Sequence, residues 1–231
     1  MFFPSRITRI ERGALVLEIG PGTQPHPRAN VFLELQYAHE EEFIRQTGGA
    51  LGVKPRNNVV LYNGERFPFS NGAFDYVICS HVIEHVGNVE YFLEEMFRVA
   101  RAGYLEYPTV LYEYLYNFNV HQNLLLMKSD ALAYMPKGDV SLSEFVAIQR
   151  FFHYTLDLGY SQLVNALADK MFQGFEWTTP FTCHRATCIE ELVPSTDDLV
   201  QWQSPPIGRI QRLRARAWSL VHSLIRRRFG T

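Results

Sequence analysis

The stretch FDYVICSHVIEHV, residues 74–86, contains the boundary that decides the fold of this chain. Its first part, 74–80, is rich in aromatic and β-branched residues, which is typical of a buried β-strand. The polar pair Ser80-His81 follows directly. We therefore expect a strand that delivers two polar side chains to one end of a sheet.

A helix is predicted after this strand, in VEYFLEEMFRVARA at 89–102. Asn88 is a favourable residue for its N-cap. The apolar residues Phe92, Met96, Val99 and Ala100 fall on one face, as in a helix that covers a sheet.

Further apolar runs on both sides of this segment also predict strands, at 14–20, 31–35, 58–63 and 103–108. The run at 14–20 is apolar without alternation, which fits a strand buried on both faces. Strands that alternate with helices predict an α/β fold with a doubly wound parallel sheet. Ligands of such sheets bind outside the carboxyl ends of the strands, so the residues after each strand are the candidates for a site.

The composition is that of a folded chain with an uneven distribution of charge. Of 231 residues, 47% are hydrophobic and 20% are charged, which favours a packed core over disorder. Seven arginines and no acid lie from Gln201 onward, which leaves 15 basic against 24 acidic residues before it. Three cysteines and a start without a leader-like apolar run predict reduced thiols in the cytoplasm. No apolar run approaches the roughly 18 residues that a bilayer requires.

Glycines and polar residues follow the predicted strands. Gly20 and Gly22 would let the backbone turn sharply and approach a ligand closely, although a plain turn explains them too. Glu34 after the second strand suits the hydroxyls of a ribose, or is simply a solvated acid. Asn63-Gly64 after the third strand offers an amide to an adenine edge, or forms a turn.

Together these motifs resemble the class I S-adenosylmethionine-dependent methyltransferases, and among them the type 11 methyltransferase domain. The resemblance covers roughly residues 12–108 and is most specific in NGERFPFSNGAFDYVICSHVIEHV, 63–86. It implies a Rossmann-like, mostly parallel sheet with a reversed last strand, and S-adenosyl-L-methionine as the cofactor. The cofactor-binding residues that it implies are Glu18, Gly20 and Gly22 at the methionine end, Glu34 at the ribose, Asn63 and Gly64 at the adenine, and Ser80 and His81 beside the sulfonium.

One segment departs from the family pattern. Gln24 stands where the family has a third glycine, and Pro25 and Pro27 follow it. Residues 21–30 alone connect the first two strands, whereas a parallel crossover normally takes a dozen residues or more. Two prolines also disfavour a regular helix. We expect a compressed, non-helical connection.

The domain organisation follows from these assignments. Residues 1–108 form the cofactor-binding, Rossmann-like half, and 109–172 form a helical cap. Residues 173–200 supply an antiparallel closing strand pair, 175–181 and 186–192, to the same domain. Residues 201–231 form a basic amphipathic C-terminal helix.

The catalytic candidates are His81, Glu106 and His121, because methyl transfer to a hydroxyl benefits from a positioned base. Glu106 could instead anchor the cap, and His121 could cap a loop. His81, Glu84 and His85 also match H-x-x-E-H, the zinc-hydrolase signature, but His81 abuts a strand rather than lying in a helix. We therefore expect no metal. A zinc hydrolase using His81 and His85, and an inactive methyltransferase-fold binding protein, are the alternatives to a methyltransferase.

The expected partner is a small-molecule acceptor. The apolar stripe of the basic C-terminal helix could dock on the body of the protein or on a second subunit in a homodimer, rest on the inner face of a membrane, or bind nucleic acid, the least favoured choice. Membrane binding would favour a lipid-linked or saccharide acceptor.

Overall fold

The computed structural model describes residues 1–22, 24–36, 58–142 and 145–194. Residues 1–193 form one compact unit, and residues 194–231 form a second. The strands are β1 (Val16–Ile19), β2 (Val31–Leu35), β3 (Val59–Tyr62), β4 (Tyr76–Ser80), β5 (Gly103–Pro108), β6 (Asn123–Lys128), β7 (Ala131–Pro136), β8 (Phe172–Trp177) and β9 (Thr182–Arg185). The helices are α2 (Val89–Val99), α3 (Val110–Tyr116), α4 (Val146–Asp157), α5 (Gln162–Ala166) and α6 (Ala168–Met171). Short 3₁₀ turns are η1 (Pro4–Arg6), η2 (Ile83–His85), η3 (Lys137–Asp139) and η5 (Ile189–Leu192).

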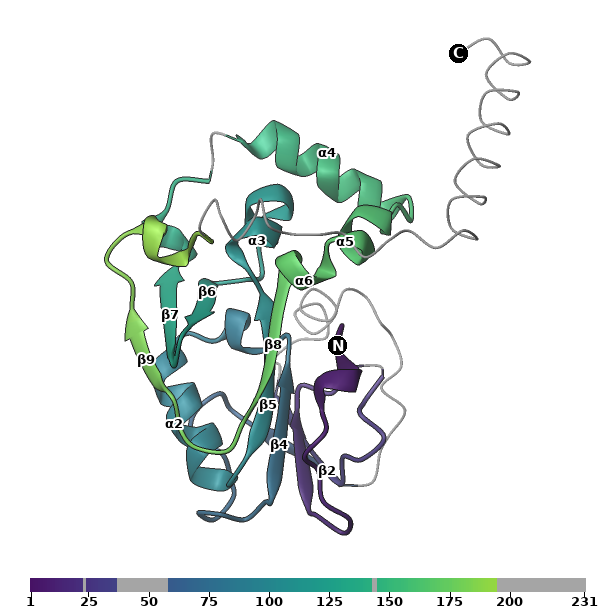
Figure 1. Cartoon of the computed structure of the whole chain (residues 1–231), viewed down its shortest axis with the longest axis vertical. Helices are drawn as coiled ribbons and strands as arrows, with labels where there is room; N and C mark the ends of the chain where they lie inside the picture. Colours follow the sequence, from purple (N-terminus) through teal and green to yellow (C-terminus); the bar gives the residue numbers. More distant parts are fainter. Residues whose placement is uncertain (23, 37–57, 143–144, 195–231) are drawn as a thin grey trace, which may run out of the picture. The chain divides into compact units, whose positions relative to one another are not determined.

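The central sheet has the strand order β3-β2-β1-β4-β5-β8 (Figure 1). Its first five strands run parallel, and β8 pairs antiparallel with β5. This arrangement confirms the predicted Rossmann-like, mostly parallel sheet with a reversed last strand. The order reverses between β1 and β4, and such a reversal opens a crevice at the carboxyl ends of the strands.

Alternate side chains of the central strands pack on opposite faces of the sheet. Leu17, Val77 and Leu105 belong to the main core, which α2 covers on one face (Figure 1). The predicted stripe is confirmed at Phe92, Met96 and Val99, which are buried on α2. The helix ends at Val99 rather than Ala102, so Ala100, although buried, follows it in extended backbone. The side chain of Asn88 caps this helix by accepting a hydrogen bond from the amide of Tyr91.

The other face of the central sheet is covered by the N-terminal segment. Val16, Tyr76 and Tyr104 are buried there, and Ile7 and Ile10 pack against them. The segment is also tied to β8, because the amides of residues 8 and 9 donate hydrogen bonds to the carboxylate of Glu176. The sequence patterns did not predict this cover.

The segment 109–172, predicted as a helical cap, also contains two strands. Helices α3, α4, α5 and α6 lie at the carboxyl end of the sheet (Figure 1). β6 and β7, which follow α3 and precede α4 in the sequence, form an antiparallel hairpin. The hairpin turn is Ser129-Asp130, and Ser129 has φ of +56°. The inward side chains of the hairpin, Leu125 and Leu132, are fully buried in the main core.

The predicted closing strand pair is correct only in its first member. β8 closes the central sheet, whereas the second member, 186–192, contains no strand and ends in the turn η5. The strand nearest to it, β9, pairs in parallel with β7 in the smaller sheet β6-β7-β9. A single antiparallel strand therefore completes the central sheet.

No helix among the described residues is long and apolar enough to cross a membrane. The predicted C-terminal helix, 201–231, lies outside the described residues.

Candidate functional site

The strand register gathers the predicted site residues along one edge of the sheet. Glu34 of β2 pairs with Leu61 of β3, and Ser80 of β4 pairs with Glu106 of β5. Gly20 continues β1 between these pairs, and its amide donates a hydrogen bond to the carbonyl of β2 at residue 33 (2.9 Å). Across four neighbouring strands the order is thus Glu34, Gly20, Ser80 and Glu106.

The glycines after β1 adopt backbone conformations that favour glycine. Gly20 has φ of +59°, and a Cβ added there would lie 2.5 Å from Cγ2 of Val82. Gly22 has φ of +54°, and no described atom lies within 4 Å of a Cβ added there. The backbone at Gly22 is therefore open to the approach of another group.

The connection between β1 and β2 is compressed, as expected, because the described residues among 21–30 form turns and irregular backbone without a helix. Glu18 is buried, and its Oε2 accepts a hydrogen bond from the amide of His26 (2.8 Å). The carboxylate thereby holds the connection in place. Its role at the methionine end of a cofactor stays a prediction.

Glu34 and Asn63 differ in their surroundings. Glu34 is half-buried, and burial raises the pKa of its carboxyl group although the amide of Leu35 donates to it (3.2 Å). Asn63 is exposed, and its Oδ1 accepts from the amide of Glu65 (3.2 Å). Gly64 has φ of +87°, so Asn63-Gly64 forms a turn. A contact of the Asn63 side-chain amide with an adenine stays a prediction.

Glu106 is fully buried and accepts hydrogen bonds from five groups. The donors are the amides of Phe2 (2.7 Å) and Phe3 (3.0 Å), the hydroxyls of Ser80 (2.9 Å) and Tyr104 (2.6 Å), and Nε2 of His81 (3.0 Å). Burial alone would raise the pKa of Glu106, but His81 and Tyr104 outweigh it and lower the pKa to about 2. A carboxylate so fully engaged is suited to hold neighbouring groups in place.

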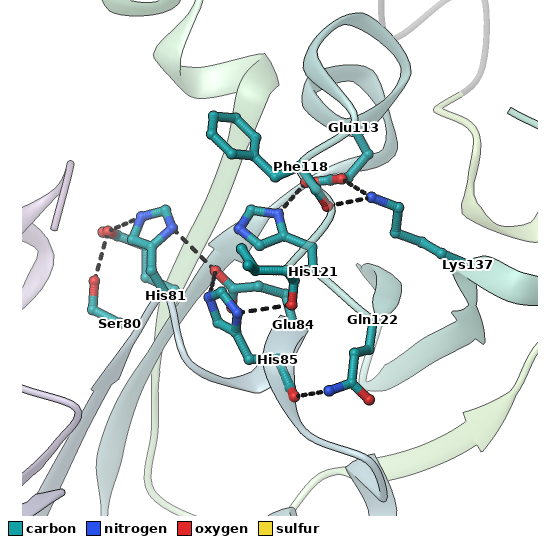
Figure 2. Close-up of polar contacts among 11 residues, drawn as sticks. Ser80, His81, Glu84, His85, Glu113, Phe118, His121, Gln122 and Lys137 are labelled. Atoms are coloured by element: carbon teal, nitrogen blue, oxygen red, sulfur yellow. Dashed lines mark hydrogen bonds and ion pairs between the residues drawn. The ribbon is translucent and has the colours of Figure 1, made fainter. Parts of the chain in front are cut away.

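His81 lies between two carboxylates at the carboxyl end of β4. Its Nε2 bonds Glu106, and its Nδ1 lies 3.4 Å from Oε1 of Glu84 (Figure 2). Burial favours the neutral imidazole, but the two carboxylates prevail and raise the pKa of His81 to about 9. Its φ of +58° is a conformation that costs a residue with a side chain about 1 kcal/mol or more.

Aromatic rings surround the imidazole of His81. The ring of Phe2 lies edge-on to it with centroids 5.5 Å apart, and Phe172 does the same at 5.3 Å. Phe2 and Phe172 stack on each other at 3.8 Å, and Tyr112 of α3 lies 4.8 Å from Phe172. The sequence patterns gave no signal for Phe2, because it lies 79 positions from His81 and 170 from Phe172 in the chain.

His121 does not belong to the same group of contacts as the other two catalytic candidates, His81 and Glu106. Its ring lies 4.7 Å from that of His85, and its Nδ1 bonds the carboxylate of Glu113 (Figure 2). The H-x-x-E-H helix that the zinc-hydrolase alternative needs is not formed. Only the 3₁₀ turn η2 is present, and His81 precedes it.

A comparison of the sequence with protein families finds one similarity. Residues 36–105 match the family model described as a methyltransferase domain, type 11. This match spans 70 of the 231 residues, and a methyltransferase domain of this kind implies S-adenosylmethionine as its cofactor. The described residues fit that cofactor, since the open backbone at Gly22 and the half-buried carboxylate of Glu34 lie at the ends of β1 and β2.

A comparison with solved structures finds partial similarities. A methyltransferase from Thermotoga maritima is 22% identical, with a TM-score of 0.32 over 46% of this chain and 49% of its own. The YcgJ protein from Bacillus subtilis is 21% identical, with a TM-score of 0.33 over 49% of this chain and 53% of its own. A methyltransferase from Mesorhizobium loti is 11% identical, with a TM-score of 0.38 over 71% and 90%. The chain thus spans about half the length of the first two, and no curated protein matches its sequence.

Proposed function

We propose that this chain transfers a methyl group from S-adenosylmethionine to a small-molecule acceptor. The observation that carries the proposal is the row of Glu34, Gly20, Ser80 and Glu106 across the carboxyl edge of four adjacent strands. A nucleoside-bearing cofactor needs several groups from different strands at one edge. The match of 36–105 to a methyltransferase domain supports the same reading.

The residues that would hold the cofactor lie along this edge. Gly20 and Gly22 would face its methionine end, Glu34 its ribose, and Asn63 and Gly64 its adenine. When bound, the cofactor supplies an electrophilic methyl group for an in-line displacement. The protein contributes alignment of the acceptor and exclusion of water, and the rings of Phe2, Phe172 and Tyr112 suit the second task.

Among the catalytic candidates, we propose that His81 meets the acceptor, because it stands at the end of β4 and its side chain is 25% exposed. Glu106 acts through His81 as a positioning residue, because it holds Nε2 at 3.0 Å while four other donors fix the carboxylate. His121 is separated from this pair by Glu84 and His85, so its role belongs to their cluster.

The substitution Glu34→Ala tests the cofactor site. A carboxylate that accepts hydrogen bonds from a ribose contributes about 1.5–3 kcal/mol, so affinity for S-adenosylhomocysteine should fall about 10- to 100-fold. Glu94→Ala is the matched control, because Glu94 is exposed on α2. Isothermal titration calorimetry of both variants measures the difference. Equal affinities for the wild type and Glu34→Ala would remove Glu34 from the ribose site.

A second candidate function is a cofactor-binding protein without turnover. Two observations favour it: Glu18 already accepts a hydrogen bond from the β1–β2 connection, and Phe2 packs against His81. Binding of S-adenosylhomocysteine without methyl transfer to any of a panel of small-molecule nucleophiles would select this function. Absence of cofactor binding would refute both candidates.

The basic segment 201–231 leads to a finer proposal about the acceptor. Seven arginines beside an apolar stripe suit an anionic membrane surface, and a lipid-linked or saccharide acceptor would then be within reach. Deleting residues 206–231 should abolish co-sedimentation with vesicles of anionic lipid. Equal sedimentation of both forms would exclude a membrane role for the tail, and a change from dimer to monomer would indicate subunit docking instead.

A further inference from the structure

A buried carboxylate without a hydrogen bond lies beside the candidate methyltransferase site. Glu84 is fully buried, and neither of its side-chain oxygens accepts a hydrogen bond from any described residue. Its nearest basic atoms are Nδ1 of His81 at 3.4 Å and Nε2 of His85 at 3.9 Å (Figure 2). Buried carboxylates are normally hydrogen-bonded or bound to a cation. His81 is an ion-pair partner of Glu84, but neither oxygen of Glu84 has a hydrogen bond, so the carboxylate can accept a further ligand.

The tautomer of His85 directs an electron pair at this carboxylate. Its Nδ1 lies 3.0 Å from the carbonyl oxygen of Val120, which can only accept, so Nδ1 carries the proton. In a neutral ring Nε2 then has a free electron pair. This electron pair and Oε1 of Glu84 face each other at 3.9 Å, and a cation between them would satisfy both.

His121, which lies in a different segment, is likewise bonded through Nδ1 to an oxygen acceptor. Its Nδ1 bonds the carboxylate of Glu113, which also accepts from Nζ of Lys137 (2.7 Å). A carboxylate that orients a histidine through Nδ1 leaves Nε2 available to a metal, and such outer partners are usual at metal sites. The ring of His121 lies edge-on to that of His85, with centroids 4.7 Å apart.

The two segments that supply these groups are fastened to each other. The amide of Gln122 donates to the carbonyl of Glu84 (2.6 Å), and its side-chain amide donates to the carbonyl of His85 (2.7 Å). The side chain of Asn123 donates to the carbonyl of Val86 (2.7 Å). These bonds hold Glu84, His85 and the start of β6 in a fixed relation before any ligand binds.

We propose that Glu84, His85 and His121 bind one divalent transition-metal cation. Their ligand atoms all lie within 4.8 Å of one another. With metal–ligand bonds of about 2.0–2.2 Å, two ligands of a tetrahedral ion are about 3.4 Å apart, so small side-chain rotations would close the site. Two imidazoles and one carboxylate favour ions such as Zn²⁺ or Fe²⁺ over Mg²⁺ or Ca²⁺, which prefer oxygen ligands.

Three protein ligands leave part of the coordination sphere open. His81 touches Glu84 on one side and Glu106 on the other, so the cation site adjoins the edge where we place the acceptor. The open positions would take water or an oxygen donor. From the sequence we expected no metal, because His81 abuts a strand. The local pattern also contains nothing that brings His121 to the turn at Glu84 and His85.

Zn²⁺ alone tests this proposal, without methyl donor or acceptor. The full chain is stripped with a chelator and titrated with Zn²⁺ by calorimetry, and the bound metal is counted by mass spectrometry. We expect one Zn²⁺ per chain and a melting temperature that rises with the cation concentration. Glu84→Gln and His121→Gln should each weaken binding by at least about 100-fold, and Glu113→Gln by about 10- to 100-fold.

Substitution by Co²⁺ identifies the ligands. With Co²⁺, a site of imidazoles and a carboxylate gives visible d–d bands but no near-ultraviolet charge-transfer band from a thiolate. The same spectrum would therefore exclude Cys183 and Cys188 as metal ligands. His184→Gln is the matched control, because His184 is exposed on β9 outside the cluster, and it should bind like the wild type.

The proposal is overturned if the folded wild type shows no saturable Zn²⁺ binding, or if Glu84→Gln and His121→Gln bind as tightly as the wild type. Circular dichroism establishes that each variant is folded. If Glu84→Gln does not fold, His121→Gln decides, since it leaves the buried carboxylate in place. The outcome is independent of methyl transfer, so failure here does not refute the proposed function.

Discussion

The substitution Glu106→Gln should destabilise the protein strongly. The carboxylate has two oxygens that share five donors, with three on Oε1 and two on Oε2. Glutamine keeps one oxygen and turns an NH₂ group toward the donors of the other. At least two hydrogen bonds to a charged acceptor are then lost, and each contributes about 1.5–3 kcal/mol. The hydroxyl donors can rotate toward another acceptor, which recovers part of this loss. The net loss is about 3 kcal/mol.

The lowered pKa of Glu106, which arises from the same contacts, corresponds to a similar magnitude. Its fall from 4.5 to about 2 corresponds to about 3 kcal/mol of stabilisation of the folded state. Because the folded pKa is the lower one, this stabilisation is fully present above pH 4.5 and is lost as the pH falls toward 2. A loss of about 3 kcal/mol in a unit of this size lowers the melting temperature by about 6–12 °C.

Urea denaturation of the wild type and Glu106→Gln at about pH 7, 4.5 and 3 measures both effects. The difference in unfolding free energy should be largest at pH 7 and should shrink below pH 4.5. Tyr104→Phe is the control that removes one donor and keeps the carboxylate, and it should cost about 1 kcal/mol. A difference below about 1 kcal/mol at pH 7, or one that does not vary with pH, would refute the reasoning.

Two further substitutions test the supports of the site. Gly20→Ala should lower the unfolding free energy by about 2 kcal/mol, because φ is +59° and the new Cβ would meet Val82. Gly138→Ala is the control and should be near neutral, because no described atom lies within 4 Å of its Cβ. Equal denaturation midpoints for the two variants would contradict this prediction. Arg98→Ala should cost about 2–3 kcal/mol at pH 7, because Arg98 donates two bonds to Glu95 (2.7 and 2.6 Å). Arg98 lowers the pKa of Glu95, so the stabilisation of the folded state by this ion pair is present above pH 4.5 and lost below it. If Arg98→Ala lowered the unfolding free energy equally at about pH 7 and pH 3 in urea titrations, this reasoning would be contradicted.

The parallel strands could be predicted because each is a short apolar run with a turn signal at its end. The bounds of β2 and β5 agree with the predicted 31–35 and 103–108, and the cap at Asn88 sets the start of α2. Once the sheet is parallel, its carboxyl edge follows, and with it the row from Glu34 to Ser80. This part of the site depends on local pattern and sheet geometry alone.

The hairpin β6–β7 could not be predicted in the same way. Its turn, Ser129-Asp130, lacks the glycine that marks most two-residue hairpins, and the run LLLM in β6 does not alternate. The apolar spacing of 109–172 therefore resembled that of helices. Burial against the central core, through Leu125 and Leu132, decides the strand conformation instead.

The polar contacts of the site depend on residues far apart in the chain. Glu106 bonds the amides of Phe2 and Phe3, which are 103 or more positions away. His121 reaches the turn at Glu84 and His85 through a loop whose path only the folded chain defines. Sequence patterns supplied these residues as candidates, but their partners follow from the tertiary structure.

The attachment of Phe2 and Phe3 to Glu106 has a practical consequence for anyone who purifies this protein. A purification handle fused ahead of Met1 would begin one residue from the Phe2 amide that bonds Glu106, next to the imidazole of His81. Such a handle would place extra residues beside that edge and interfere with ligand binding there. Assays of ligand binding and turnover should therefore use material from which any N-terminal handle has been cleaved.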